Sequence, residues 1–163
     1  MTSAHGSQWR AVPLGLAGAV VLVDQLTKWW ALRRLPDGAI DVIWTLRFRL
    51  TFNSGMAFGT GQGWGPVIAI AAFVVVIALA RSMWHQRSRV SAVAIGCLVG
   101  GATGNLIDRV AREPGPFRGS VVDFIDFGWF PVFNVADIAI NVGAALLVFT
   151  MVSEGRRERG ASA

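Results

Sequence analysis

The sequence predicts an all-α integral membrane protein, with four transmembrane helices and a small extracytoplasmic β-strand element. Of its 163 residues, 53% are hydrophobic and only 15% are charged, whereas a soluble domain carries about a quarter charged residues. The mean hydropathy is +0.52. Seven Trp and ten Phe are also typical of a chain that places aromatic side chains at membrane interfaces. The length predicts a single membrane domain, residues 1–163.

Four apolar runs have the length that a bilayer requires, which is about 20 residues. We expect helices over about 11–32, 64–84, 91–110 and 135–153. The first run resembles a signal peptide, but it lacks a clean small-x-small cleavage site and continues into polar residues that include Asp24 and Lys28. We therefore expect it to be retained as a membrane span.

The acidic residues gather at one end of the predicted bundle. Four antiparallel spans bring together the ends of the first and third helices and the start of the fourth. Eight of the ten carboxylates map to that end: Asp24, Asp37, Asp41, Asp108, Glu113, Asp123, Asp126 and Asp137. The basic turn 81–89 and the basic tail 156–159 favour the cytoplasm under the positive-inside rule. We therefore expect both termini in the cytoplasm and the acidic end on the extracytoplasmic side.

Charge and cysteine usage exclude several classes of function. The net charge is +5, but the Arg clusters flank apolar runs, so we expect anionic lipid headgroups as partners and no nucleic acid. Cys97 is the only cysteine and lies in an apolar run, where it reads as an inert core residue. Neither His5 nor His85 lies near the acidic motifs. A Cys-His or Ser-His-Asp site is not expected, and neither is a metal or another cofactor, because Ca²⁺-loop spacing is absent.

A strand pattern lies between the first two spans. Apolar and mostly polar residues alternate with period two over about 42–53, and a turn follows at Asn53-Ser54-Gly55. Such a strand at a membrane surface could rest its apolar face in lipid and direct Arg47 and Arg49 at headgroups. The alternative is the edge of a small sheet without any ligand role.

The third span carries a seam of small residues followed by polar ones. Gly96, Gly100 and Gly104 have the small-xxx-small spacing that lets helices approach closely in lipid. Asn105 shares a helical face with Asp108 and Arg109, at i+3 and i+4. These three side chains read either as a buried polar knot that ties helices together or as donors aimed into a cleft. For Asp108 a structural role, as the partner of an Arg or as a cap, is favoured.

Asp24 and Lys28 have the i, i+4 spacing of an ion pair on a helix surface. Such a pair is usually structural. A catalytic lysine needs a lowered pKa, and a neighbouring carboxylate acts in the opposite direction. The spacing therefore argues against a Ser54/Lys28 catalytic pair.

Asp123 and Asp137 are the strongest candidates for chemistry. Each is enclosed by apolar neighbours, in Val-Val-Asp-Phe and Phe-Asn-Val-Ala-Asp. Ionisable residues at membrane depth are costly and usually functional, and two close carboxyls can share one proton. The structural alternative is that Asp137 lies in the first turn of the fourth helix, where the helix dipole favours a carboxylate and Asn134 is a plausible cap.

Five motifs in order carry a resemblance to a known family. They are Asp24-Gln25-x-x-Lys28, Asn53-Ser54-Gly55-Met56-Ala57-Phe58, Gly100-Gly101-x-x-Gly104-Asn105-x-x-Asp108-Arg109, Val121-Val122-Asp123-Phe124 and Phe133-Asn134-Val135-Ala136-Asp137. The chain resembles the bacterial lipoprotein signal peptidases, or type II signal peptidases. The motifs span residues 24–137, and the segment 111–120 between them looks like a variable loop rich in Pro and Gly.

The resemblance implies an intramembrane aspartic endopeptidase of the bacterial cytoplasmic membrane. It would remove the signal peptide from prolipoproteins whose cysteine carries diacylglycerol, cutting on the N-terminal side of that cysteine. Globomycin-type antibiotics are ligands of the family, and its extracytoplasmic β-cradle matches the strand 42–52. The implied catalytic pair is Asp123 and Asp137. The implied substrate-binding positions are Asn53, Asn105, Arg109 and Asn134, and the implied supporting positions are Asp24, Lys28, Gly101, Gly104 and Asp108.

The hypothesis for the mechanism uses one proton shared by two carboxyls. The ionised member takes a proton from water, and the protonated member stabilises the developing oxyanion. The sequence leaves open which aspartate is protonated at rest, and whether the loop 111–133, which ends in the apolar and aromatic segment 124–133, acts as a lid over the site. We expect a monomer. The alternative class is a small proton-linked transporter or channel, since intramembrane Asp and Arg also build proton relays.

Overall fold

A computed structural model describes residues 11–55, 65–85 and 88–161 of the chain. Motif residues 56–58 and the expected start of the second span at residue 64 lie outside the described residues. The helices are α1 (Ala11–Arg34), α2 (Gly65–Ser82), α3 (Arg89–Ala111) and α4 (Val135–Ala161), with a short 3₁₀ turn at Met83–His85. Four segments are long and apolar enough to cross a membrane, the last being Val135–Glu154. With the sheet described below, they confirm the predicted fold class.

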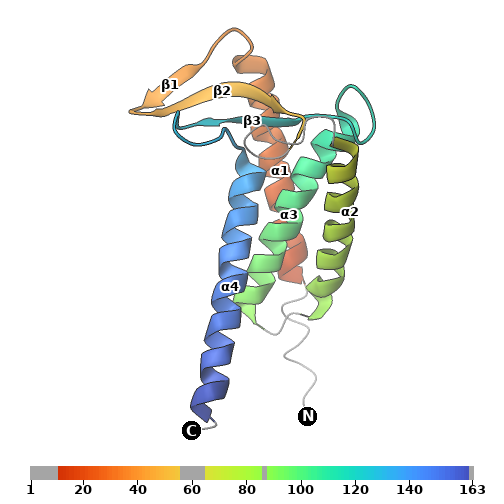
Figure 1. Cartoon of the computed structure of the whole chain (residues 1–163), viewed down its shortest axis with the longest axis vertical. Coiled ribbons are helices and arrows are strands. Elements are labelled where there is room, and N and C mark those ends of the chain that lie inside the picture. The colour runs from red at the N-terminus through yellow and green to blue at the C-terminus, as the bar shows by residue number, and fades with distance from the viewer. Residues whose placement is uncertain (1–10, 56–64, 86–87, 162–163) are drawn as a thin grey trace.

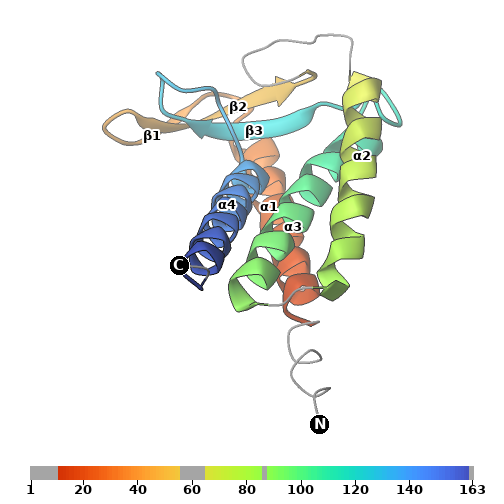
Figure 2. The ribbon, with the colours of Figure 1, turned by 60° about the horizontal axis from the view of Figure 1, so that its bottom comes forward.

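Helix α3 is the centre of the bundle. It packs against α1, α2 and α4, and in Figures 1 and 2 it lies between α2 and α4. Small residues permit this close approach. A Cβ on Gly100 would lie 2.9 Å from the carbonyl oxygen of Ala17 on α1, and a Cβ on Gly143 of α4 would lie 2.7 Å from the carbonyl oxygen of Ala94. The small-residue seam therefore brings helix backbones together, as expected in lipid.

The outward faces of the helices are apolar. Leu22 of α1, Val74 of α2 and Phe149 of α4 are each about 60% exposed in the isolated chain (60%, 58% and 63%). In water such surfaces would drive aggregation, whereas lipid tails cover them without cost. The buried residues are concentrated on α3, so the core of the bundle follows the helix that has neighbours on most of its sides.

A three-stranded antiparallel sheet covers one end of the bundle (Figure 1). Its strands are β1 (Ile40–Ile43), β2 (Leu46–Asn53) and β3 (Val121–Asp126), in the order β1-β2-β3. Helices α1 and α3 end at the sheet and α4 begins there, and in Figure 1 the last turns of α1 rise behind the strands. The ladder between β2 and β3 pairs Thr51 with Asp123 and Asn53 with Val121.

The structure corrects the expectation of one continuous strand over 42–53. The chain reverses between β1 and β2, and Trp44 has a φ of 54° in that turn. A non-glycine residue rarely adopts positive φ, so the alternation of residue types did not reveal the turn. The third strand, β3, lies within the segment 111–133 that the sequence suggested as a loop. Its residues, Val-Val-Asp-Phe-Ile-Asp, do not alternate between apolar and polar, so no strand pattern was visible.

The sheet selects between the two interpretations of the 42–53 segment. The segment is part of a small sheet, and Phe48 and Leu50 pack on a buried cluster formed by Ala31, Leu35 and Phe124. Arg47 and Arg49 do not simply point at headgroups. Their Nε atoms lie 2.8 and 2.7 Å from Oδ2 of Asp126 on β3. Phe48 and Leu50 thus cover the end of α1, whereas the apolar residues Val42, Trp44 and Phe52 of the same segment are exposed.

Candidate active site

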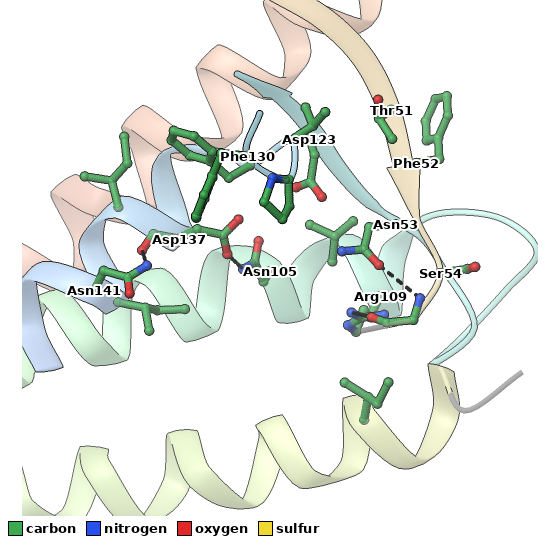
Figure 3. A pocket seen from close by; sticks show the side chains of 18 of the residues that line it. Thr51, Phe52, Asn53, Ser54, Asn105, Arg109, Asp123, Phe130, Asp137 and Asn141 are labelled. Carbon is green, nitrogen blue, oxygen red and sulfur yellow. Dashed lines mark hydrogen bonds between the residues drawn. The ribbon is translucent and has the colours of Figure 1, made fainter. Parts of the chain in front are cut away.

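Asp123 and Asp137 are joined by two asparagine side chains. Asn134 Nδ2 donates to Asp123 Oδ1 over 2.6 Å and to Asn105 Oδ1 over 3.1 Å. Asn105 Nδ2 donates to Asp137 Oδ1 over 2.8 Å. These four residues come from α3, β3 and the start of α4, so the network forms only when the bundle and the sheet pack together. Figure 3 shows Asp123, Asp137 and Asn105 around one pocket.

Asn134 and Asp137 form a reciprocal cap at the start of α4. The N–H of Asp137 donates to Asn134 Oδ1 over 3.0 Å, and the N–H of Asn134 donates to Asp137 Oδ2 over 3.2 Å. This satisfies N–H groups that a helix start leaves without partners. The cap that the sequence suggested is therefore present, and it coexists with the contact of Asn134 to Asp123. The hydrogen bonds that cap α4 therefore also fix the positions of Asn134 and Asp137 in the site.

A buried ion cluster lies behind the asparagines. Lys28 Nζ lies 2.8 Å from Asp24 Oδ2 and 2.8 Å from Asp108 Oδ2, and all three side chains are 0% exposed. The expectation of a surface ion pair on α1 was therefore wrong. Spacing along one helix fixes which residues can pair, but neighbouring helices decide whether that face is buried.

The carboxylates of the ion cluster also hold the elements that carry Asp123 and Asp137, the pair of aspartates that we call the dyad. Asp24 Oδ1 accepts the N–H of Ala136 at the start of α4 over 3.0 Å. Asp108 Oδ2 accepts the N–H of Val122, next to Asp123, over 3.2 Å. Each acid thus fixes the backbone of one strand or helix beside a dyad member. Lys28 pairs with both carboxylates, and Arg112 adds a second positive charge at Asp108, so neither acid is buried without a partner.

Two glycines of α3 make room for this arrangement. A Cβ on Gly101 would collide with the carbonyl oxygen of Ala136 and lie 2.8 Å from Ile140. A Cβ on Gly104 would lie 2.6 Å from Asp24 Oδ2. The side chains of Asp24 and the first turn of α4 can approach α3 only because these positions lack a side chain.

Arg109 extends from α3 toward the turn after β2. Its Nη2 donates to the carbonyl oxygen of Gly55 over 2.9 Å, and the residue is 7% exposed. Among the described residues its buried Nη1 has no hydrogen-bond partner. A buried guanidinium donor without a partner is costly, and Arg109 also lines the pocket. It is therefore a donor available to a bound carbonyl or carboxylate.

Asn53, at the end of β2, is another polar side chain that lines the pocket. Its Oδ1 accepts the N–H of Gly55 over 3.1 Å (Figure 3), and its side chain acts to lower the pKa of Asp123. Because Oδ1 is engaged by a donor, the amide nitrogen is the atom that can face the carboxyl.

The Asp123 carboxyl has an unusual environment. Burial, followed by the nearby negative charge of Asp137, raises its pKa to about 7, although hydrogen bonds from Asn134 and Asn53 and the positive charge of Lys28 oppose this rise. A carboxyl with such a pKa exists in both protonation states near neutral pH. That property suits a group that must give and take a proton.

The dyad opens into a pocket of about 1080 Å³. Its walls come from β2, α2, α3, β3, the segment after β3, and α4, and they are mainly apolar. Ile68 of α2 lines one side, and Ile138 and Val142 of α4 line the other. The aromatic segment contributes Phe130 and Phe133, which pack on each other with ring centroids 5.8 Å apart. The pocket thus offers an apolar volume beside a small polar centre.

The structure brings together all eleven site residues that the sequence singled out, and it adds others. Gln25 donates to the Gly104 carbonyl oxygen over 3.1 Å, and Arg112 Nε lies 2.7 Å from Asp108 Oδ1. The i, i+4 spacing of Asp108 and Arg112 could have revealed the latter. Nothing in the sequence indicated that Arg47 and Arg49 would bind Asp126. Their hydrogen bonds, with that of the Gly128 N–H, outweigh burial and lower the pKa of Asp126.

The fold and the site define a multi-pass membrane protein with an acid–base pocket at one end of its bundle. The chain belongs to the signal peptidase II family, whose model, described as signal peptidase (SPase) II, matches residues 16–153. Membership of this family implies a protease.

Individual relatives agree with this assignment. The chain is 43% identical to a lipoprotein signal peptidase of Mycolicibacterium smegmatis, with 92% of this chain and 67% of the relative covered. It is 41% identical to that of Mycobacterium avium, with 90% and 85% covered. Two solved structures, each described as a bacterial membrane enzyme, are 32% identical, with TM-scores of 0.77 and 0.74. They cover 89% and 86% of this chain, which spans 90% and 92% of theirs.

Proposed function

We propose that the chain is an aspartic endopeptidase that removes the signal peptide from diacylglyceryl-modified prolipoproteins, cutting on the N-terminal side of the lipidated cysteine. The observation that carries the proposal is the pair Asp123 and Asp137, linked through Asn134 and Asn105 at the wall of one pocket. Membership of the signal peptidase II family supplies the reaction class.

The proposed chemistry needs one proton on the dyad. Water held between the carboxyls attacks the scissile carbonyl and gives one proton to the ionised aspartate, while the protonated aspartate gives its proton to the carbonyl oxygen. In the second step the aspartate that took the proton from water passes it to the leaving nitrogen, and the C–N bond breaks. The other aspartate recovers a proton from the tetrahedral intermediate. The products are a carboxylic acid and an amine, and the dyad returns to its starting state.

Polar side chains around the dyad suit an extended peptide. Arg109 has a buried Nη1 that lacks a partner among the described residues, and the half-buried Asn53 lies at the end of β2. In this proposal both bind backbone carbonyl groups of the signal peptide, while Asn105 and Asn134 hold the carboxyls.

The apolar part of the pocket suits the lipid of the substrate. Helices α2 and α4 line it from opposite sides, and Figure 2 shows them apart, with α3 between. In this proposal the diacylglyceryl chains occupy the space between them and reach it from the bilayer. Each buried methylene contributes about 0.8 kcal/mol, so an unlipidated precursor would bind much more weakly. Globomycin-type inhibitors would compete for the same pocket.

The orientation, location and oligomeric state form part of the proposal. The sheet and pocket would face the extracytoplasmic side of the bacterial cytoplasmic membrane, with both termini in the cytoplasm, and the chain would act as a monomer. Arg81 in the last turn of α2 and Arg89 at the start of α3 lie at the bundle end opposite the sheet, which supports this orientation.

The distribution of buried charged residues argues against the alternative of a proton-linked transporter or channel. The buried charged residues are Asp24, Lys28, Asp108, Arg109, Asp123 and Asp126, and all belong to the end that carries the sheet. Of the buried polar residues in the described chain, Thr150 alone lies toward the other end. A proton path across the membrane would need polar groups along its length.

A direct cleavage assay tests the proposal. Purified protein in lipid nanodiscs is incubated with a prolipoprotein that carries diacylglycerol and with its unlipidated form. We expect peptide release from the lipidated substrate alone, and none from Asp123→Asn or Asp137→Asn, while both variants still fold. Cleavage of lipidated substrate by either variant at more than about 1% of the normal rate would reject the dyad, because general acid–base groups contribute about 10²–10⁴-fold.

A further inference from the structure

Lys28 determines the direction of a hydrogen-bond chain that ends at the dyad. Its Nζ lies 3.0 Å from Asn105 Oδ1, in surroundings where the Lys28 side chain is 0% exposed. An ammonium group only donates hydrogen bonds. The amide of Asn105 must therefore present its oxygen to Lys28, and its nitrogen then faces Asp137, where Nδ2 donates to Oδ1 over 2.8 Å.

The direction of the second amide is fixed in the same way. The backbone N–H of Asp137 donates to Asn134 Oδ1 over 3.0 Å, and a backbone N–H also only donates. Asn134 Nδ2 must therefore face the other side, where it donates to Asp123 Oδ1 and Asn105 Oδ1. Two donors that cannot reverse, the ammonium of Lys28 and one backbone N–H, thus orient both asparagines.

The two aspartates end up in different environments. Asp137 receives a donor on each oxygen, Asn105 Nδ2 on Oδ1 and the Asn134 N–H on Oδ2, and it lies in the first turn of α4. Both features stabilise a carboxylate. Asp123 lies on a strand, is 2% exposed, accepts one hydrogen bond, from Asn134 Nδ2 on Oδ1, and faces the charge of Asp137. Its burial favours the neutral acid.

We propose that Lys28 is a positioning residue that, through Asn105, keeps Asp137 ionised and leaves the single proton of the dyad on Asp123. The role in turnover rests on the proposed function, whereas the location of the proton does not. Asp137 would then be the group that takes a proton from water, and Asp123 the group that protonates the carbonyl oxygen. A reversed Asn105 amide would turn its NH₂ toward Lys28 and its oxygen toward Asp137, which would need the proton on Asp137.

The surrounding charges do not produce this asymmetry by themselves. The charged groups around the dyad are Asp24 and Lys28 of α1, Asp108 and Arg109 of α3, and Arg112 directly after α3. The positive charge of Lys28 favours ionisation of both Asp123 and Asp137, so simple attraction to Lys28 does not decide which of the two holds the proton. The directed hydrogen bond through Asn105 acts on Asp137 alone.

Infrared spectroscopy locates the proton without any turnover. At about pH 5.5 an ordinary carboxyl is almost entirely ionised, so a C=O band of a protonated carboxyl reports the dyad. We expect the protein in nanodiscs to show this band, Asp123→Asn to remove nearly all of it, and Asp137→Asn to retain it. Retention of the band in Asp123→Asn with its loss in Asp137→Asn would overturn the assignment, and so would absence of the band from the unmodified protein.

A matched pair of variants tests the role of Lys28. Asp24→Asn keeps the Lys28 donor, whereas Asp24→Asn combined with Lys28→Met removes it and keeps the charge of the cluster balanced. With the donor present, adding Asp123→Asn should still remove nearly all of the band. Without it, the Asn105 amide can reverse, and adding Asp123→Asn should remove about half of the band or less, as the proton divides between the two sites. Equal loss in both backgrounds would reject the role of Lys28.

Turnover supplies a second readout that a merely structural residue would not change. If the proposed function holds, the acid limb of the pH–rate profile should move by about one pH unit in the Asp24→Asn, Lys28→Met double variant relative to Asp24→Asn alone. Replacing Lys28→Met by Lys28→Arg in the same Asp24→Asn background should return the limb to its position in Asp24→Asn. An unmoved limb in a folded double variant contradicts the proposal. If the double variant does not fold, the infrared assignment in the single Asp variants decides. A protein that shows the assigned band but cleaves nothing refutes the proposed function alone.

Discussion

The stability of the fold should depend on pH through Asp123, and in a direction opposite to that of most aspartates. The pKa of Asp123 is about 7 in the fold, because of burial and then the charge of Asp137. An exposed aspartate has a pKa of about 3.9. Between these values the folded protein holds a proton that the unfolded chain has released, so the free energy of unfolding falls as pH rises.

The magnitude follows from the two pKa values. The stabilisation is complete below about pH 4 and is lost as pH rises through about 7, at about 1.4 kcal/mol per pH unit. Between pH 5 and pH 8 the loss amounts to about 2–3 kcal/mol, because the curve flattens above 7. For a chain of this size such a loss lowers the unfolding temperature by roughly 5–10 °C.

Asp123→Asn removes this dependence and retains an oxygen that can accept from Asn134. The variant should therefore gain about 2–3 kcal/mol relative to the unmodified protein as pH rises from 5 to 8, while cleavage is lost. Cys97, the single cysteine, is buried and reports unfolding, since a thiol-reactive dye labels it only after the bundle opens. Thermal ramps in detergent at several pH values give the difference between the two proteins.

Asp41→Asn is the matched control, because Asp41 is an exposed aspartate on β1 of the same sheet. Its difference from the unmodified protein should be constant across the pH range. A difference between Asp123→Asn and the unmodified protein that does not change from pH 5 to pH 8 would refute the reasoning about the buried carboxyl.

Three further perturbations test other parts of the structure. Gly101→Ala should lower the free energy of unfolding by about 1–3 kcal/mol, because its Cβ would meet the Ala136 carbonyl. Gly15→Ala, which has open space around it, should change little in the same thermal assay, and equal effects would contradict the close approach of α3 and α4. Asp126→Asn should cost less than about 1 kcal/mol at low salt and almost nothing near 1 M salt, because its arginine partners are 41% and 47% exposed. An equal loss at both salt concentrations would show that the ion pairs are not screened. Arg109→Ala should raise KM for lipidated prolipoprotein more than it lowers kcat, and steady-state kinetics that show a loss in kcat alone would contradict a role in binding.

The active site shows how far local sequence reasoning extends. The apolar neighbours of Asp123 and Asp137 indicated enclosed carboxyls, and the first-turn position of Asp137 indicated a cap. Both features depend on residues close in the chain. The connection between the two aspartates could not be inferred in that way, because it runs through Asn105, which comes from another helix.

The sequence by itself determined the class of fold, because bilayer-length apolar runs leave the backbone few alternatives to helices. It also determined which end of the bundle carries the carboxylates, since antiparallel spans fix that from order alone. Only the tertiary structure decided that the Asp24–Lys28 pair is buried, that the chain turns at Trp44, and that β3 pairs with β2. Burial, pairing and pKa depend on atoms that are distant in the chain, and periodicity along a single segment carries no information about them.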